Sequence, residues 1–333
     1  MSTHAATYAA RVPFTPIAPS APLTPVGQAA LRGLTAEPRS LPAWLFYDAA
    51  GSALFERITL LPEYYPTRTE RAIFAANADA IIATAAGSDT LSIAELGAGT
   101  ATKTGILLAA AVRAQGSVIY CPIDVSASAL ESAKKLETEL PGVIVDAQVA
   151  DYTTQPILFD EAQGKRLVLY IGSSIGNFTP EDAVRVLRRV RDQLRPGDTL
   201  LLGTDMKKDE KILVAAYDDA AGVTAEFNRN VLRRLNRELG ADFDLQHFSH
   251  CAVWNEQECR MEMYLISDTE QRVGIDALGC ELEFAAGDTI HTENSYKFTQ
   301  KSIAWLLKQS GFALNRQWMD EKEWFAVNLA VAV

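Results

Sequence analysis

The sequence predicts an α/β fold with a parallel sheet covered by helices on both faces, and three observations lead to that class. From residue 70 onward, short apolar runs alternate with helical patterns, as in a series of βαβ units. The runs are almost continuously apolar, which is typical of strands buried on both faces of a sheet. Several runs end in a carboxylate or a glycine turn. Because ligands bind beyond the carboxyl ends of parallel strands, we expect the functional site at that edge.

The N-terminal region is expected to precede the sheet. Prolines recur among Ala, Ser and Thr up to about Arg39, and this composition does not build a helix core, so an arm or linker is predicted there. An aromatic segment over 41–48, an apolar helix pattern through Ile58 and a second aromatic segment over 61–68 follow. Tyrosines in such segments are as often packed in a core as in contact with a ligand, and both interpretations stay open.

The next part of the chain predicts five buried strands separated by helices. The strands are expected over 91–96, 117–124, 143–151, 167–171 and 199–205, and the helices over 69–86, 103–114, 128–139 and 182–194. Beyond them, alternating runs at 251–254 and 260–266 are typical of antiparallel strands. Further elements are expected as helices over 231–239 and 301–309 and a last strand over 324–333. The alternating runs therefore indicate a region foreign to the parallel sheet.

Composition and charge limit the class of partner. At 333 residues, with 48% hydrophobic and 22% charged residues, the chain has the size and composition of a globular protein with one large or two medium domains. Its net charge of -11 argues against nucleic acid, whose phosphates are neutralised by Lys and Arg. No apolar run approaches the roughly 20 residues of a membrane span, and no signal peptide is recognisable. We expect a cytoplasmic monomer acting on a small molecule, without nucleic acid or membrane partners.

The cysteine and histidine spacing predicts no metal site. No C-x-x-C pair occurs, and the histidines do not complete a zinc pattern with the cysteines. His247 and His250 come nearest to the spacing of a pair of metal ligands. Two histidines at the edge of a strand would show the same spacing, so the pair does not indicate a metal site.

The segment Leu91–Thr100 reads as a strand that runs through Glu95 into a tight glycine turn, with a helix behind it. Gly97 and Gly99 let a ligand approach the backbone, and glycine tolerates the positive φ of such a turn. A dinucleotide fingerprint would have a third glycine where this chain has Thr102. A ligand without a pyrophosphate therefore fits better, and the predicted cofactor is S-adenosylmethionine.

Two further carboxylates end the next two predicted strands. Asp124 stands where an acidic residue accepts hydrogen bonds from ribose hydroxyls. Asp151 stands where a carboxylate can accept from the adenine amine, with Tyr152 against the ring. Either aspartate alone could instead cap the helix that follows it. Their occurrence on successive strands behind a glycine turn favours the cofactor interpretation.

Several segments resemble the L-histidine Nα-methyltransferases of ergothioneine biosynthesis, a family of histidine-specific, S-adenosylmethionine-dependent enzymes. The similar segments extend from about Trp44 to Phe298, and their order and spacing make chance similarity very improbable. They are Tyr47-Asp48 with Tyr64-Tyr65-Pro66-Thr67-Arg68, the run from Leu96 to Lys103-Thr104, Gly172-Ser-Ser-Ile-Gly-Asn177-Phe178, the run from Tyr217 to Leu232, and Thr292-Glu293-Asn-Ser295-Tyr-Lys297-Phe298.

The resemblance implies a Rossmann-like class I methyltransferase sheet with a second, α+β substrate-binding domain. The methyltransferase domain would comprise 70–207, completed at the C-terminus by 297–333. The second domain would combine the N-terminal 1–69 with the inserted residues 208–296. Substrate would then lie in the crevice between the domains, which is a usual place for small-molecule sites.

The resemblance also implies the site residues. Glu293 and Ser295 are the selective pair, because residues two apart on a strand face the same side and these two can satisfy both imidazole nitrogens. Asn177 and Tyr217 suit the carboxylate, Tyr47 the α-amine, and Met263 the ring; Tyr47 and Asn177 are the candidate catalytic residues. The implied cofactor contacts are Tyr64, Gly97, Gly99, Lys103, Asp124, Asp151 and Tyr152, and the implied substrate contacts are Tyr47, Gly172, Ser174, Asn177, Tyr217, Met263, Glu293 and Ser295.

The implied reaction transfers three methyl groups to the α-amine of L-histidine, giving the trimethylated betaine hercynine. A second possibility keeps the chemistry but takes tryptophan or another aromatic amino acid, as fungal members of the family do; the Glu293 and Ser295 pair favours histidine. A nicotinamide-dependent oxidoreductase is disfavoured by Thr102. A non-catalytic S-adenosylmethionine-binding protein is disfavoured by the full set of substrate residues.

Overall fold

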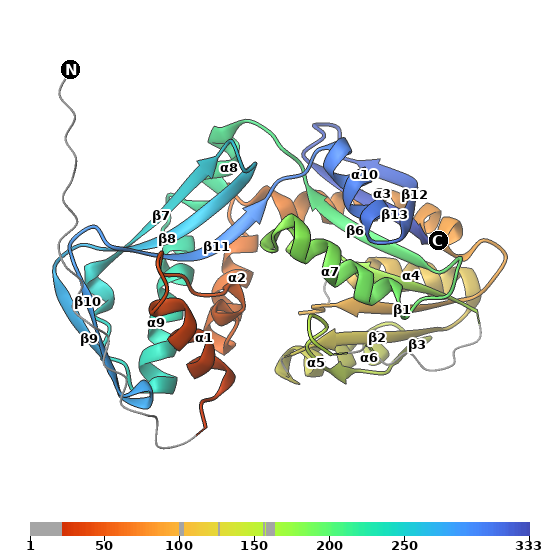
Figure 1. Ribbon diagram of the computed structural model, residues 1–333. Helices are drawn as coiled ribbons and strands as arrows, with labels where there is room; N and C mark the ends of the chain where they lie inside the picture. The colour runs from red at the N-terminus through yellow and green to blue at the C-terminus, as the bar shows by residue number, and fades with distance from the viewer. Residues whose placement is uncertain (1–21, 100–102, 126, 156, 158–163) are drawn as a thin grey trace. The chain divides into compact units, whose positions relative to one another are not determined.

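The computed structural model describes residues 22–99, 103–125, 127–155, 157 and 164–333 (Figure 1). The chain divides into two compact units. The first contains the described residues up to Ile58 together with Asp218–Ala252 and Glu262–Glu293, and the second contains Thr59–Tyr217, Val253–Met261 and Asn294–Val333. The two domains expected from the sequence, with boundaries at 69, 207 and 296, stay a prediction.

The second unit is built on an eight-stranded sheet. Its strands follow the order β12-β13-β6-β5-β1-β2-β3, and β4 also pairs with β2. The pairs among β1, β2, β3, β4, β5 and β6 are parallel, whereas β13 is antiparallel to both β6 and β12. The strands are β1 Leu91–Leu96, β2 Val118–Asp124, β3 Val143–Val145, β4 Gln148–Val149, β5 Lys165–Tyr170, β6 Thr199–Asp205, β12 Phe312–Met319 and β13 Phe325–Ala332. The predicted α/β class is confirmed, with a mostly parallel sheet.

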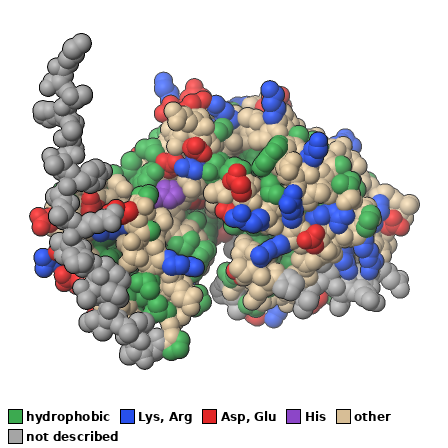
Figure 2. Space-filling model, in the orientation of Figure 1, with side chains coloured by type: hydrophobic (Ala, Val, Ile, Leu, Met, Phe, Trp, Pro, Cys, Tyr) green, Lys and Arg blue, Asp and Glu red, His purple; other side chains and the backbone are tan. Residues whose placement is uncertain are grey.

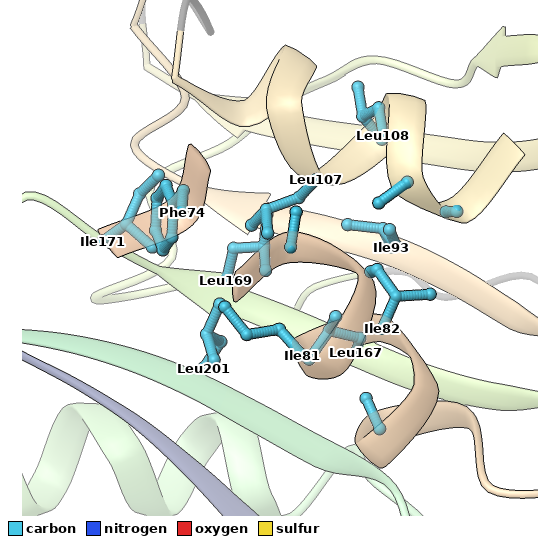
Figure 3. Packing of buried hydrophobic residues seen from close by; sticks show 14 of the residues in the cluster. Phe74, Ile81, Ile82, Ile93, Leu107, Leu108, Leu167, Leu169, Ile171 and Leu201 are labelled. Atoms are coloured by element: carbon cyan, nitrogen blue, oxygen red, sulfur yellow. The ribbon is translucent and has the colours of Figure 1, made fainter. Parts of the chain in front are cut away.

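Helices cover both faces of this sheet, as predicted. On one face, Phe74 and Ile81 of α3 and Leu107 of α4 pack with Leu167 and Leu169 of β5 (Figure 3). On the other face, buried side chains of α7 and α10 pack on the alternate residues of the same strands. The helical segments of this unit are α3 Tyr65–Ala86, α4 Thr104–Gln115, α5 Ala127–Lys134, α6 Leu136–Glu139, η2 Ser174–Asn177, α7 Pro180–Arg191, α8 Glu210–Tyr217 and α10 Gln300–Gln309.

The first unit combines helices with two small sheets. A three-stranded sheet has the order β11-β8-β7, and β9 pairs with β10 in an antiparallel ladder. Its core is aromatic, with the Phe46 and Phe227 rings stacked at 4.6 Å. The elements, some of which end in the second unit, are α1 Pro25–Leu34, η1 Ala43–Phe46, α2 Ala49–Thr59, α9 Val223–Leu239, η3 Leu245–His247, β7 Phe248–Asn255, β8 Arg260–Ser267, β9 Gln271–Ile275, η4 Asp276–Leu278, β10 Cys280–Phe284 and β11 Thr289–Tyr296.

Helix α1 corrects the expectation of an arm or linker up to Arg39. Thr24 caps the helix by accepting from the Gly27 amide at 3.1 Å, and Pro25 occupies its first turn. Proline there loses only an N–H that has no partner within the helix, so it starts the helix and does not prevent it. Val26 and Leu34 are buried. The part of the expected arm before residue 22 lies outside the described residues.

One strand prediction was wrong, and one strand was missed. The strand expected over 143–151 is two short strands, β3 and β4, both paired with β2. Strand β12 was not predicted, because only two of its eight residues are buried and its sequence has no long apolar run. It pairs with β13 at the edge of the sheet, which makes the C-terminal part of the sheet antiparallel.

The exposed arginines of α7 contact neighbouring groups of the protein. Figure 2 shows Lys and Arg side chains on the viewed face of the second unit, where α7 lies in Figure 1. Arg185 pairs with Asp182, Arg188 donates to the Gln309 carbonyl, and Arg189 donates to a backbone carbonyl. Among the described residues, no helix has the length and apolar character needed to cross a membrane.

Candidate active site

The glycine turn joins the ends of β1 and β2. Gly97 and Gly99 have φ of 65° and 51°, in the left-handed region that glycine adopts at little cost. The Gly97 amide donates to the Ile123 carbonyl at 2.8 Å, and the Gly99 amide donates to Asp124 Oδ2 at 3.2 Å. The structure thus brings the predicted turn beside the predicted ribose-binding carboxylate. Thr102, which carried the argument against a dinucleotide, lies outside the described residues.

Glu95, the acidic residue in the glycine motif, faces the protein interior. Both of its carboxylate oxygens accept from Thr104 Oγ1 at 2.8 Å, and Tyr120 also donates to it. Burial raises the pKa of Glu95 to about 7, against the opposing effect of these hydrogen bonds. Glu95 therefore stabilises the glycine turn from the protein interior, and its carboxylate is not placed to bind a ligand.

Asp151 and Tyr152 follow β4. Asp151 Oδ1 accepts from the Thr153 amide at 2.9 Å, and Oδ2 accepts from Thr154 Oγ1 at 2.8 Å. Burial opposes ionisation, but these bonds outweigh it and lower the pKa of Asp151. Asp151 thus caps its own turn, which was the alternative to a cofactor role, and it remains ionised and half-buried.

Tyr152 lies close to the glycine turn. A Cβ atom on Gly97 would stand 3.8 Å from the Tyr152 ring and hydroxyl. Its hydroxyl has a partner, since it lies 3.3 Å from the Tyr170 hydroxyl, and burial raises the pKa of Tyr152 to about 12. The phenol is therefore neutral at physiological pH and presents an uncharged ring beside the turn.

Lys103 and Gly172 are linked by a residue that the sequence did not single out. Glu70 of α3 has a side chain that is 0% exposed and forms an ion pair with Lys103. Its two carboxylate oxygens also accept from the Gly172 amide at 2.9 and 3.0 Å. A Cβ on Gly203 would stand 2.3 Å from Glu70 Oε1, so glycine is needed in β6 to admit this carboxylate. Glu70 thereby joins the start of α4 to the end of β5.

The segment after β5 forms the short helix η2, which carries Ser174 and Asn177. Ser174 donates to the Ile171 carbonyl at 3.2 Å. Gly176 packs so closely on β11 that an added Cβ would lie 2.8 Å from the Tyr296 carbonyl oxygen. Asn177 is half-buried, and its amide makes no hydrogen bond with another described residue. Its donors and acceptor are therefore available to a ligand.

Tyr217 and Ser295 come together at the ends of α8 and β11. The Tyr217 hydroxyl donates to Ser295 Oγ at 2.7 Å. The Lys297 ammonium donates to both oxygens, at 2.8 Å to Tyr217 and 2.9 Å to Ser295, and forms an ion pair with Asp205 at 2.8 Å. Two predicted substrate residues are thus joined by a lysine to which the sequence analysis had given no role.

Asp205 anchors this group at the end of β6. It accepts from Tyr65 Oη at 2.8 Å and pairs with Lys208 as well as Lys297. Burial opposes its ionisation, but the two lysines outweigh that effect and lower the pKa of Asp205. Burial also lowers the pKa of Lys208 to about 8, against the effect of Asp205.

Three of the remaining predicted residues lie in the first unit. Tyr47 is 40% exposed, and its ring packs edge-on against Phe55 at 5.8 Å and Phe227 at 5.7 Å. Met263 is 1% exposed, and Glu293 is half-buried on β11. Tyr64, the remaining cofactor candidate, lies in the second unit, half-buried at the start of α3.

The residues at the edge of the sheet fit S-adenosylmethionine. A turn with two left-handed glycines, an ionised carboxylate beyond β4 and a neutral aromatic ring beside the turn supply the acceptors and the stacking surface that an adenosine group needs. Within the described ranges, no group of three His, Cys, Asp or Glu side chains could hold a metal ion.

Glu70, Asp205 and Lys297 were missed as contributors to this edge. Asp124 and Asp151 were predicted because ligands bind at the carboxyl ends of parallel strands. Asp205 ends β6, so the same rule would have found it. Glu70 and Lys297 gave no comparable signal, because charged residues on a helix or strand are usually solvated and their partners are distant in sequence.

Comparison with known proteins identifies the family. Residues 26–332 match the family model described as histidine-specific methyltransferase, SAM-dependent. The chain is 49% identical to histidine N-alpha-methyltransferase of Mycolicibacterium smegmatis, over 90% of this chain and 92% of that protein. It is 46% identical to the Mycobacterium tuberculosis protein of the same name, with the same coverage. Ergothioneine biosynthesis protein 1 of Neurospora crassa is 30% identical over 86% of this chain and 32% of that protein. The chain belongs to the histidine-specific, S-adenosylmethionine-dependent methyltransferase family.

Proposed function

We propose that this protein transfers three methyl groups from S-adenosylmethionine to the α-amine of L-histidine, giving hercynine in ergothioneine biosynthesis. The observation that carries the proposal is the similarity to histidine N-alpha-methyltransferases along nearly the whole chain. When bound, the cofactor supplies an electrophilic methyl group on a sulfonium. The proposed cofactor contacts are Tyr64, Gly97, Gly99, Lys103, Asp124, Asp151 and Tyr152.

Catalysis requires the amine to be bound unprotonated, with its lone pair directed at the methyl group. Positioning of two reacting groups contributes much of the rate in such a displacement. Removal of water from the α-ammonium lowers its pKa, so a dry site does not need a strong base. Tyr47 is proposed to contact the amine, and its ring face would hold the cation that forms as methyl groups accumulate.

The rest of the substrate is proposed to be held by polar groups on several elements. Gly172, Ser174 and Asn177 follow β5, and Asn177 and Tyr217 would donate to the α-carboxylate. Glu293 and Ser295 would take the two imidazole nitrogens, because the two side chains share one side of β11. Met263 would pack against the ring.

A competition assay tests this assignment of substrate. Purified protein is incubated with labelled S-adenosylmethionine and each of the twenty amino acids separately, and then with histidine and tryptophan together. We expect label transfer to histidine in preference to every other amino acid. Preferential transfer to tryptophan would instead show that the protein is an N-methyltransferase of tryptophan. Absence of label transfer to any of the twenty amino acids would refute the proposed function.

A further inference from the structure

Tyr47 stands at the centre of a tight turn between η1 and α2. It has φ of -92° and ψ of 59°, and the Asp48 amide donates back to the Phe46 carbonyl at 3.1 Å. This is an inverse γ-turn, and it leaves Tyr47 40% exposed while Phe46 is buried. One hydrogen bond across two residues closes such a turn, so the direction of the Tyr47 ring depends on what holds Phe46 and Asp48.

Helix α9 holds the residues on both sides of Tyr47. The Phe46 ring stacks on α9, as described above, and Arg234 donates to the Leu45 carbonyl at 3.1 Å. Two further α9 side chains bond to Asp48. Residues three or four apart lie on one face of a helix, and the α9 residues that make these contacts have that spacing: Phe227, Asn230, Arg234 and Arg237.

Asp48 bonds to two helices at once. Its Oδ1 accepts from the Gly51 amide at 2.7 Å, which caps α2, and from Asn230 Nδ2 at 2.8 Å. Its Oδ2 accepts from Arg237 at 2.7 Å. Burial opposes ionisation, but these bonds outweigh it and lower the pKa of Asp48. The cap of α2 needs only the first bond, whereas the other two connect Asp48 to α9.

The contact between Asp48 and Asn230 is buried and closely packed. Asn230 is 0% exposed, and its amide group must donate to the carboxylate, because an amide oxygen cannot. A Cβ atom on Gly51 would lie 1.7 Å from the Phe46 carbonyl oxygen and 2.9 Å from Asn230 Nδ2, so α2 needs glycine to approach this closely. A buried polar pair favours one arrangement, since any other leaves polar groups unpaired.

We propose that Asp48 and Asn230 are positioning residues that hold the Tyr47 ring face in the direction required for the third methyl transfer. The inference rests on the proposed function, in which Tyr47 contacts the amine. In the third transfer the nitrogen lone pair forms the N–C bond as the S–C bond breaks, no proton is released, and the nitrogen becomes permanently charged. It has no N–H to donate, so an aromatic face is the group that can stabilise this charge.

The first transfer differs in this respect. Its product nitrogen keeps hydrogens, which can bond to a hydroxyl or to water or leave as a proton. A misdirected Tyr47 ring should therefore slow the third transfer more than the first.

The test compares kcat/KM for L-histidine and for Nα,Nα-dimethylhistidine, as initial rates of substrate consumption with excess S-adenosylmethionine. In Asn230→Leu we expect the value for dimethylhistidine to fall about fivefold more than that for histidine, the size expected for partial loss of a cation–π interaction. Asp48→Ser should shift the ratio in the same direction. Serine still caps α2, but its single short hydroxyl cannot also reach Asn230 and Arg237.

The matched control is Asn236→Leu, also on α9. The Asn236 amide bonds to the Phe243 backbone at 2.8 and 3.0 Å, so its loss should leave the ratio of the two kcat/KM values at the wild-type level. A variant that is only less folded loses both values in proportion. If Asn230 acts through Tyr47, adding Asn230→Leu to Tyr47→Leu should not shift the ratio further.

The outcomes separate the inference from the proposed function. An unchanged ratio in either variant, once circular dichroism shows it to be folded, would overturn the inference, as would an equal shift by Asn230→Leu with and without the Tyr47 ring. If Asn230→Leu does not fold, Asp48→Ser decides alone. Failure of the wild-type protein to methylate histidine would overturn the proposed function itself.

Discussion

Replacement of Glu95 by glutamine should make the protein more stable at neutral pH and remove much of the pH dependence of its stability. In the native protein Glu95 is 2% exposed beneath the glycine turn, and burial raises its pKa from 4.5 to about 7. When the pKa of a carboxyl group is higher in the native than in the unfolded protein, its protonation stabilises the fold. This stabilisation is fully present at pH values below the unfolded pKa, and it is lost as the pH rises through the native pKa.

The size of the effect follows from the shift. The difference of about 2.5 pKa units, taken from 4.5 to about 7, corresponds to about 3 kcal/mol at about 1.36 kcal/mol per unit. Relative to Glu95→Gln, the wild-type free energy of unfolding should therefore fall by about 3 kcal/mol between pH 4.5 and pH 8. Glutamine retains an acceptor for Tyr120, and its amide can donate to the Thr104 hydroxyl.

Urea unfolding followed by circular dichroism across this pH range measures the difference. The matched control is Glu270→Gln, because Glu270 is exposed; its stability should follow the wild-type curve. A constant difference between wild type and Glu95→Gln from pH 4.5 to 8 would refute the reasoning. A loss of stability in Glu95→Gln at pH 8 would show that the ionised carboxylate is the form that the fold favours.

Three other predictions concern ligands. Asp124→Ala should weaken S-adenosylmethionine binding by about 1.5–3 kcal/mol, the range for a hydrogen bond with a charged partner; unchanged affinity by calorimetry in a folded variant would exclude Asp124 from the site. Glu293→Ala should leave cofactor affinity intact and weaken histidine binding by about 1–3 kcal/mol, because an imidazole N–H loses its acceptor; turnover of histidine at the wild-type rate and KM would contradict the pocket assignment. Glu70→Gln should weaken cofactor binding through Lys103, since the ion pair is lost while an amide oxygen still accepts from Gly172; a variant with wild-type cofactor affinity but reduced stability would limit Glu70 to a structural role.

The sequence predicted the part of the fold that depends on continuous apolar runs. The strand expected over 199–205 has those bounds in β6 because every residue in it is buried. By contrast, β12 has only its first residue and Trp318 buried, so hydrophobic periodicity gave no signal. Helix α1 was missed because Pro25 was read as a breaker, although at the first turn it starts a helix.

The candidate site was predictable where a residue type and its place at a strand end implied a role. Asp124 and the glycine turn are examples, and the structure joins them through the Gly99 amide. The hydrogen bonds of Lys297 were not predictable in this way. Its partners come from β6, α8 and β11, and only the folded chain brings them within about 3 Å of one ammonium group, a normal hydrogen-bond distance.

The most direct test of the central claim locates the methyl groups on the product. Protein is incubated with L-histidine and excess S-adenosylmethionine, and the product is fragmented in a mass spectrometer. The account predicts three methyl groups, all on the α-nitrogen, with an unmodified imidazole. A methyl group on a ring nitrogen would contradict the placement of the imidazole against Glu293 and Ser295, and with it the proposed orientation of the substrate.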